Sequence, residues 1–295
     1  MPSYFRIPRL SILALLVLFT SACGPAPEAQ TQNDPDKEEW AELFNGKDLE
    51  GWTPKIAHYE PGENFGNTFR VADGAIQVSY DQYTDFNESF GHLFWKDKYS
   101  HYRLVVEYRF IGTWLHDTPG WAYRNSGIMF HSQAPETMLK AQNFPISLEA
   151  QFLGGLGEGE RHTMSLCTPG TEAYQNGVML ASHCTTSTSK TYDGDQWVTV
   201  ELEVLGHDNI RHIAEGATVI EYQTPEIGGG TVDGFDPATK PDGQPLGEGY
   251  FALQSEGSPV EFRRVALLNL SGCMDATAKN YKSYFVNSDA AACTF

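Results

Sequence analysis

Basic residues are scarce in this chain. Of its 295 residues only 20 are Lys or Arg, against 38 Asp or Glu, which gives a net charge of −18. Nucleic-acid binding depends on Lys and Arg gathered opposite phosphates, so the composition argues against a nucleic-acid partner. A solvated acidic surface is the simplest reading of the charge. The aromatic content of 13% leaves room for sugar stacking, although most of these rings are expected in the core.

Long amphipathic helices and internal repeats are also missing. With 28 glycines and 16 prolines, the chain consists of short alternating segments broken by Gly, Asn and Asp turns. Hairpins are predicted over residues 69–78, with Asp73-Gly74 at the turn, and over 210–222, around Glu215-Gly216. Further strands are predicted at 102–110, 197–205, 250–254 and 262–270. Many strands at this spacing predict one all-β sandwich.

The apolar run at residues 10–19 is too short to span a bilayer comfortably. It follows Arg6 and Arg9 and ends in the sequence TSACG. This resembles the lipobox of a bacterial lipoprotein signal peptide, in which Cys23 is acylated and becomes the first mature residue. Thr20 departs from the usual Leu, so simple secretion with a free Cys23 is the alternative.

These signals predict a signal peptide at 1–22 and a disordered, polar tether at 23–38. The protein is therefore expected in a bacterial cell envelope. It would be lipid-anchored to the outer or cytoplasmic membrane, facing the periplasm or the exterior, with no other membrane contact.

Cysteine spacing of the zinc-binding kind is absent, because no two cysteines follow a C-x₂₋₄-C pattern. Outside the cytoplasm an even number of cysteines favours disulfides, and four allow three pairings. Proximity favours Cys167–Cys184 and Cys273–Cys293. A metal site with His162 and His183 is the rival for the first pair.

Two segments, 124–131 and 147–152, alternate cleanly between apolar and polar residues. Each therefore offers a core face and a polar face as a strand. The polar residues are Asn125 and His131 in the first segment and Glu149 and Gln151 in the second. We expect the two polar faces to line one cleft.

An ordered series of short motifs gives a more specific indication. The motifs are LFNGKDLEGW at 43–52, VADG at 71–74, NSGI at 125–128, EAQ at 149–151, CTPG at 167–170, HC at 183–184, GDQW at 194–197, and LQ at 253–254 with FR at 262–263. Together they resemble the 3-keto-disaccharide hydrolase family, formerly a domain of unknown function, with a concanavalin A-like jelly-roll fold. The resemblance predicts a domain at 39–270 and implies that its partner is an oxidised (3-keto) glycoside or another carbohydrate.

Such a substrate sets the chemistry. A ketone at C3 acidifies the hydrogen on C2, a base removes it, and the enolate expels the aglycone from C1. The site needs a general base, a donor or cation at the enolate oxygen and an acid for the leaving group. Laminarinase-type enzymes on this fold instead carry a Glu-x-Asp-x-(x)-Glu strand. Here Glu149 is followed on its face by Gln151, so a single acid is expected and conventional two-carboxylate hydrolysis is disfavoured.

The catalytic hypothesis makes Glu149 the base or a ligand-orienting carboxylate, with His131 as its acid or base partner and Arg124 or Arg109 at the enolate. The alternatives are an ordinary turn residue for Asn125, a buried carboxylate paired with Arg109 or Arg124 for Glu149, and a solvated or hydrogen-bonded strand residue for His131. The remaining candidates are expected to contact substrate: Asn125, Gln151, Glu107, Arg109, Trp121, His183 and Gln254. For Trp121 packing under its loop is the alternative to stacking, and for His183 a surface role.

No cofactor is required by the sequence. A divalent metal held by Glu107, Glu149, His131 and His183 is left open, because such an ion would stabilise an enolate. A non-catalytic, lectin-like carbohydrate-binding module is the alternative function, since the fold alone does not choose between them. A cell-surface interaction protein would instead need a large apolar patch.

Residues 271–295 form a Cys-bounded tail. The run GCMDATAKNY at 272–281 resembles a repeat found at the ends of many secreted bacterial proteins. Its close, Asp289 to Cys293, departs from the Asp-Gly-Ser-Cys of those repeats, which puts ion binding in doubt. About 25 residues are too few for a core, so a disulfide staple is expected. Attachment and a structural cap are both open as its role.

Overall fold

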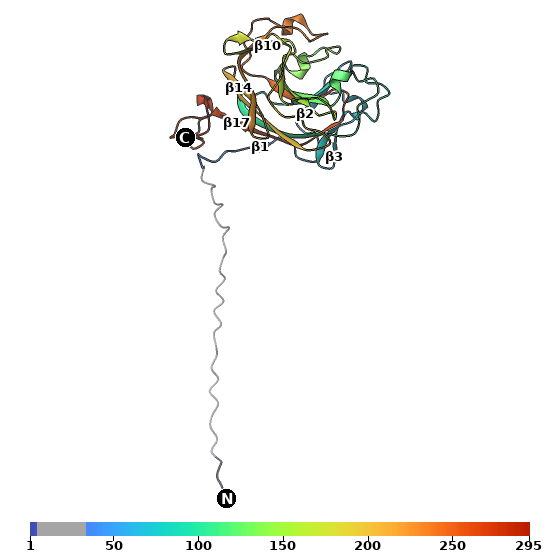
Figure 1. The fold of residues 1–295 in the computed structure, drawn as a ribbon. Coiled ribbons are helices and arrows are strands. Elements are labelled where there is room, and N and C mark those ends of the chain that lie inside the picture. Colours follow the sequence, from blue (N-terminus) through green and yellow to red (C-terminus); the bar gives the residue numbers. More distant parts are fainter. Residues whose placement is uncertain (5–33) are drawn as a thin grey trace. The chain divides into compact units, whose positions relative to one another are not determined.

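The computed structural model describes residues 1–4 and 34–295, and two antiparallel β-sheets stack face to face in the second stretch (Figure 1). Most of the predicted signal peptide, Cys23 and most of the tether lie outside the described residues. No described helix is long and apolar enough to cross a membrane. The prediction of an all-β sandwich of the jelly-roll kind is confirmed.

Ten strands make the larger sheet and seven the smaller. The larger sheet contains β1 (Ala41–Glu42), β3 (Phe69–Ala72), β4 (Ala75–Val78), β6 (His101–Phe110), β10 (Thr171–Gln175), β11 (Val178–Met179), β13 (Val198–Leu205), β14 (Asn209–Ala214), β15 (Ala217–Ile227) and β17 (Val260–Asn269). The smaller runs in the order β12 (Cys184–Thr185), β9 (Ser165–Cys167), β8 (Leu148–Leu153), β7 (Asn125–Ser132), β16 (Tyr250–Ser255), β5 (Gly91–Trp95) and β2 (Trp52–Ile56).

The helical elements among the described residues are short 3₁₀ turns. They are η1 (Phe65–Asn67), η2 (Gly120–Ala122), η3 (Pro135–Thr137), η4 (Pro237–Thr239) and η5 (Ala290–Ala292). Both predicted hairpins are present. Their turn residues have positive φ angles, 50° and 76° at Asp73 and Gly74, and 46° and 81° at Glu215 and Gly216. Two consecutive positive φ values match the twist of the flanking strands, which explains these Asx/Glu-Gly turns.

The core lies between the two sheets. Alternation in β6 turns Leu104, Val106 and Tyr108 inward, and all three are buried. From the smaller sheet Phe152 meets them, and its ring stacks on that of Tyr108 at 4.1 Å and 7°. Full burial of one such side chain stabilises the fold by about 1.5–3 kcal/mol. The smaller sheet thus has one face in the core, and its other face is free to hold a site.

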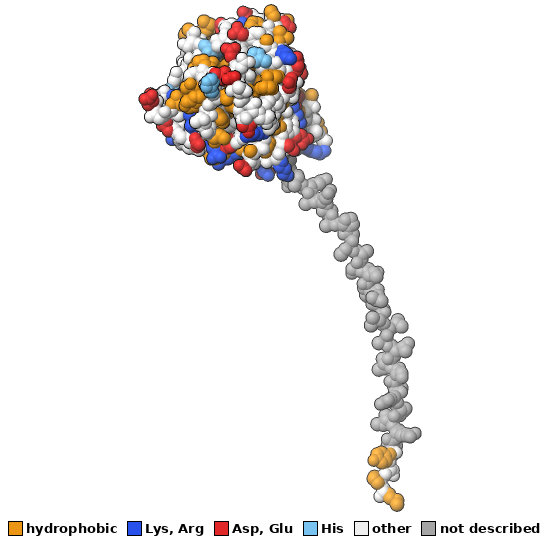
Figure 2. Space-filling model, turned by 90° about the vertical axis from the view of Figure 1, so that its right-hand side faces the viewer, with side chains coloured by type: hydrophobic (Ala, Val, Ile, Leu, Met, Phe, Trp, Pro, Cys, Tyr) orange, Lys and Arg blue, Asp and Glu red, His pale blue; other side chains and the backbone are white. Residues whose placement is uncertain are grey.

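The outer face of the larger sheet is a network of ion pairs. Arg109 Nε lies 2.7 Å from Glu261 Oε2, and Arg263 pairs with Glu107. The guanidinium groups of Arg109 and Arg263 lie 4.6 and 4.4 Å from the ring of Trp197. Figure 2 shows acidic side chains scattered over one face of the protein among basic ones. On the outer face of the larger sheet these arginines and glutamates are therefore paired.

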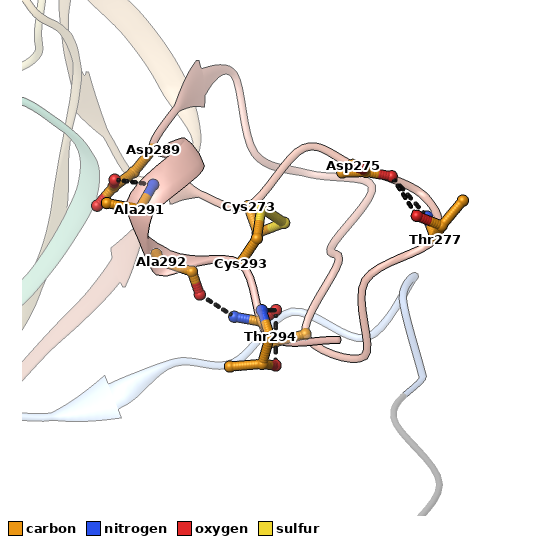
Figure 3. Close-up of a disulfide and its surroundings, with 9 residues drawn as sticks. Cys273, Asp275, Thr277, Asp289, Ala291, Ala292, Cys293 and Thr294 are labelled. Atoms are coloured by element: carbon orange, nitrogen blue, oxygen red, sulfur yellow. Dashed lines mark hydrogen bonds between the residues drawn. A yellow bond between two sulfur atoms is a disulfide. The ribbon is translucent and has the colours of Figure 1, made fainter.

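Both predicted disulfides are present. Cys167–Cys184 joins β9 to β12 at an edge of the smaller sheet. Cys273–Cys293 closes the tail (Figure 3). The tail also contains the short parallel pair β18 (Ser271–Gly272) and β19 (Asn287–Ser288).

The tail's carboxylates are used in its own turns. Asp275 accepts hydrogen bonds from the backbone and hydroxyl of Thr277, and Asp289 accepts one from the backbone of Ala291 (Figure 3). The buried Lys282 donates to the carbonyl of Asp34 at 3.0 Å. These contacts hold the turns of the tail together and join the tail to the chain at Asp34.

Candidate active site

A cavity of about 330 Å³ opens over the outer face of the smaller sheet. This volume is at the lower end of the ~300–1,000 Å³ usual for small-molecule sites. The lining residues are Trp121, Asn125, Phe144, Glu149, Gln151, Cys167, Pro169, His183, Cys184, Thr231 and Glu256. Strands supply its floor and loops supply its rim.

The two segments singled out by alternation do form part of one cavity. Asn125 from β7 and Glu149 and Gln151 from β8 all line it. The strands pair so that Gly127 lies opposite Gln151. A Cβ atom at Gly127 would come within 2.9 Å of Glu149 Oε1, so the absence of a side chain there makes room for this carboxyl group.

A second acid lies in the same cavity. Glu256 follows β16 directly and is 2% exposed, while Glu149 is 6% exposed. Gln254 Nε2 donates a hydrogen bond of 3.0 Å to Glu256 Oε1. The expectation of a single acid is therefore wrong. The missed signal was the alternation of β16 continued by one step, which puts Glu256 on the same side as Gln254.

The two carboxyl groups are electrostatically linked. Burial raises the pKa of Glu149, against the effect of its hydrogen bond with Gln254. Burial also raises the pKa of Glu256, well above its usual value, and the nearby charge of Glu149 adds to the rise. Both shifts favour the protonated carboxyl group, and once Glu149 is ionised its charge disfavours ionisation of Glu256. The pair can thus offer one base and one acid.

Two polar atoms of the floor have no hydrogen-bond partner among the described residues. They are Oδ1 of Asn125 and Oε2 of Glu256. Leaving buried polar groups unpaired is costly, by about 1–3 kcal/mol each. A ligand rich in hydroxyl groups would satisfy them.

Arg124 and His131 do not line the cavity. The Arg124 guanidinium bonds the carbonyls of Gly194 and Phe110, so it ties loops together. His131 is buried at the far end of β7, where Nε2 lies 2.9 Å from the carbonyl oxygen of Gly206. Burial lowers the pKa of His131 to about 4, which keeps it neutral. The expected contacts of Arg124 and His131 with substrate are corrected accordingly.

Glu107 and Arg109 are also placed away from the cavity, on the outer face of the larger sheet. Alternation identifies an outward face correctly but does not tell which sheet bears the site. The four proposed metal donors are consequently not assembled, since only Glu149 and His183 of that set line the cavity. The sulfur atoms beside His183 belong to the disulfide and are not free thiolates.

Trp121 and His183 line the cavity at its rim, and Gln254 lies behind the floor. The Trp121 side chain is 56% exposed, and its ring stacks on Phe90 at 5.9 Å and 18°. Packing under the loop thus accounts for one face of the indole only. The backbone carbonyl of His183 accepts hydrogen bonds from Thr168, and burial lowers the pKa of its imidazole.

Lys55 and His92 continue the polar row beside Gln254 and were missed from the sequence. The register pairs Lys55 with His92 and His92 with Gln254. Lys55 Nζ donates to the carbonyls of Ile56 and Lys140 at 3.0 and 3.3 Å. Burial lowers the pKa of Lys55 to about 8, and burial together with Lys55 lowers that of His92 to about 3. Both nitrogens of the His92 ring lack a partner among the described residues.

Residues 39–268 match the model of a family described as a 3-keto-alpha-glucoside-1,2-lyase-like domain. The chain belongs to this family. The resemblance drawn from the short motifs is thereby confirmed. Membership in the lyase-like family supports a carbohydrate-related, glycoside-acting function for the chain. None of the curated proteins compared with it matches.

Solved structures similar to this lyase-like protein have low identity. One protein of Parabacteroides distasonis, provisionally assigned as a glycosyl hydrolase, is 17% identical at a TM-score of 0.45, covering 78% of this chain and 93% of its own. A carbohydrate-binding module from Bacillus subtilis is 12% identical at a TM-score of 0.40, covering 74% and 96%. LamA from Zobellia galactanivorans, solved with laminaritriose and laminaritetraose, is 12% identical at 0.41, covering 78% and 98%. Likeness at this level carries no argument about function.

Proposed function

We propose that this protein is an extracytoplasmic enzyme that cleaves 3-keto-glycosides by removing the C2 proton and eliminating the aglycone. The observation that carries the proposal is the buried carboxyl pair of Glu149 and Glu256 on the floor of one cavity. Family membership supports the class of substrate. The pair supplies a base and an acid without any further titrating group.

Each proton has a destination in this scheme. Ionised Glu149 takes the proton from C2, and the electron pair enters the enolate of the C3 ketone. The enolate then forms the C1–C2 double bond as the C1–O bond breaks. Burial and the charge of Glu149 raise the pKa of Glu256, so Glu256 keeps its proton until it protonates the leaving oxygen. Later addition of water to the double bond gives net hydrolysis.

The enolate needs hydrogen-bond donors, and the arginines proposed from the sequence do not reach the cavity. The side-chain amides of Asn125 and Gln151 line the floor and take this role. Hydrogen bonds aimed at the oxygen where charge develops are the largest single contribution in many enzymes. No step requires a metal.

Glu256 also favours a second candidate. Ordinary glycosidases work with two carboxyl groups, one ionised and one protonated, and this floor contains two.

The lectin-like alternative is supported by the exposed ring of Trp121. That alternative gives no reason to bury two acids together at a cost in stability.

The test is a pair of substrates incubated with the purified full-length chain, with and without chelator. Methyl 3-keto-glucoside should lose methanol and methyl glucoside should not, and deuterium at C2 should slow the reaction. Cleavage of methyl glucoside without an isotope effect would identify an ordinary glycosidase. Sugar binding with no cleavage of either compound would favour the module, and loss of activity with chelator would require a metal.

We further propose the placement outside the cytoplasm that the sequence predicts, with a signal peptide at 1–22, acylated Cys23 and a tether at 23–38. The two disulfides are compatible with it. In a bacterial host, Cys23→Ser should move the protein from the membrane fraction to the soluble fraction of the envelope. A parent protein that is already soluble would favour simple secretion.

A further inference from the structure

The indole of Trp121 is a fixed platform at the cavity rim. Its own carbonyl accepts a hydrogen bond of 3.4 Å from Asn125 Nδ2, and Ser258 Oγ donates one of 3.0 Å to the carbonyl of Ala122. One face of the ring packs on Phe90, and the side chain remains 56% exposed. The turn is therefore held on both sides while an aromatic face stays open beside the floor.

The rest of this wall has little hydrogen-bonding capacity. Phe144, Pro169 and the Cys167–Cys184 disulfide line the same cavity, and their side chains carry carbon and sulfur only. Phe144 joins the platform through Phe90, with ring centroids 4.7 Å apart. The polar atoms gather on the strand floor, with His183 and Thr231 as the polar members of the rim. The cavity thus combines a floor suited to one sugar ring with a largely apolar, aromatic wall.

We propose that the leaving group accepted by this wall is an aryl group, so that the substrates are phenolic glycosides oxidised at C3. The inference rests on the proposed function. A second sugar placed against the wall would turn hydroxyl groups toward carbon and lose their hydrogen bonds to water. A planar aromatic ring would instead stack on the open face of Trp121 and bury its edge against Phe144.

The chemistry of the leaving group agrees. When the C1–O bond breaks, its electron pair goes to the phenolic oxygen, which then takes the proton from Glu256. A phenol has a pKa of about 10, as tyrosine does, so its oxygen departs with less assistance than an alkoxide. No Lys or Arg is among the described residues that line the cavity, so no cation assists there. An aryl aglycone therefore needs the least stabilisation of its leaving oxygen from such a site.

Binding of unreactive analogues tests the wall directly. Phenyl 1-thioglucoside and cyclohexyl 1-thioglucoside have similar size and differ in aromaticity, and their dissociation constants can be measured by calorimetry on the full-length chain. We expect the phenyl compound to bind about two- to tenfold more tightly. Trp121→Ala should abolish the preference. Trp121→Leu, which keeps an apolar contact with Phe90, should abolish it as well.

Trp114→Ala is the matched control. Trp114 lies in the same loop, but its ring stacks on Tyr123 at 4.1 Å and does not line the cavity, so the preference should survive. Equal binding of both thioglucosides to the parent, or a preference unchanged in both Trp121 variants, overturns the aryl inference. Turnover of methyl 3-keto-glucoside, which has no aryl group, separately tests the proposed function. If that turnover is present without a phenyl preference, only the aryl inference fails, and if both are absent, both fail.

Discussion

Glu256→Gln should lower kcat for elimination from a 3-keto-glucoside by about 10²–10⁴-fold, the usual contribution of a general acid or base. Glutamine keeps the shape of the side chain and can still accept the hydrogen bond from Gln254 Nε2. It cannot deliver a proton to a leaving oxygen. Glu149→Gln should cause a loss of the same order, because the amide cannot take the C2 proton. Single-turnover kinetics with the two variants measure the effect on the chemical step.

The matched control is Glu261→Gln. Glu261 is also 6% exposed, but it pairs with Arg109 on the outer face of the larger sheet. Its substitution should leave kcat near that of the parent. Parent-like activity in either site variant would remove that acid from the mechanism. The double variant should lose little more than the worse single variant, since two groups that act as a unit are not additive.

The fold follows from local signals in the sequence. Strands such as β6 and β13 alternate without interruption, and Gly74 and Gly216 fix the turns where positive φ is needed. Alternation with period two requires no knowledge of distant residues, so the predicted strands and hairpins agree with the structure to within a residue or a few. Sequence proximity was likewise enough for both disulfides.

The site was only partly predictable, because it combines local and tertiary information. Asn125, Glu149 and Gln151 could be found from the alternation of two strands. Which sheet bears the cavity depends on how the two sheets stack, and alternation within one strand does not contain this information. For this reason the sequence wrongly predicts Arg109 as a residue of the site. Glu256 was not predicted because it lies far from Glu149 in the sequence. It directly follows β16, two residues after the recognised Leu253-Gln254 motif.

Other departures came from burial. His131 is a polar residue on the expected face, but β7 extends beyond the cavity. There the Nε2 atom of His131 is hydrogen-bonded to the carbonyl oxygen of Gly206. Lys55 and His92 are each the one titratable residue in a short strand, so no local pattern marks them as part of a site. Only the register of β2, β5 and β16 shows that they continue the row of Gln254.

Buried histidines and the buried Glu149 make the stability of this protein depend on pH in two opposing ways. His92, His131 and His212 have lowered pKa values, so the unfolded state binds their protons first and stability falls as pH drops below about 6.5. Glu149 has a raised pKa, so the folded state holds its proton more tightly. Its contribution is complete below about pH 4.3, the usual value for Glu, and is lost as pH rises through the raised one. Stability is therefore expected to be greatest at mildly acidic pH.

Glu149→Gln should consequently stabilise the protein at alkaline pH while it lowers turnover. At pH 9 the parent must ionise a carboxyl group that burial disfavours, and the amide avoids this cost. Each unit of pKa shift is worth about 1.4 kcal/mol. A gain of about 1 kcal/mol or more should raise Tm by roughly 2–4 °C or more. At pH 5 the parent carboxyl is protonated, and the two Tm values should converge.

Thermal unfolding of parent, Glu149→Gln and Glu261→Gln at pH 5, 7 and 9 decides the matter. Glu261→Gln breaks the ion pair with Arg109 and should gain nothing at pH 9. Parallel Tm curves for the parent and Glu149→Gln would mean that Glu149 is ionised at no cost, and Glu149 would then lack the raised basicity that proton abstraction from C2 requires. A gap that opens with pH would show that the burial which destabilises the folded protein also makes Glu149 a stronger base, which is the trade-off expected when a fold maintains a reactive group.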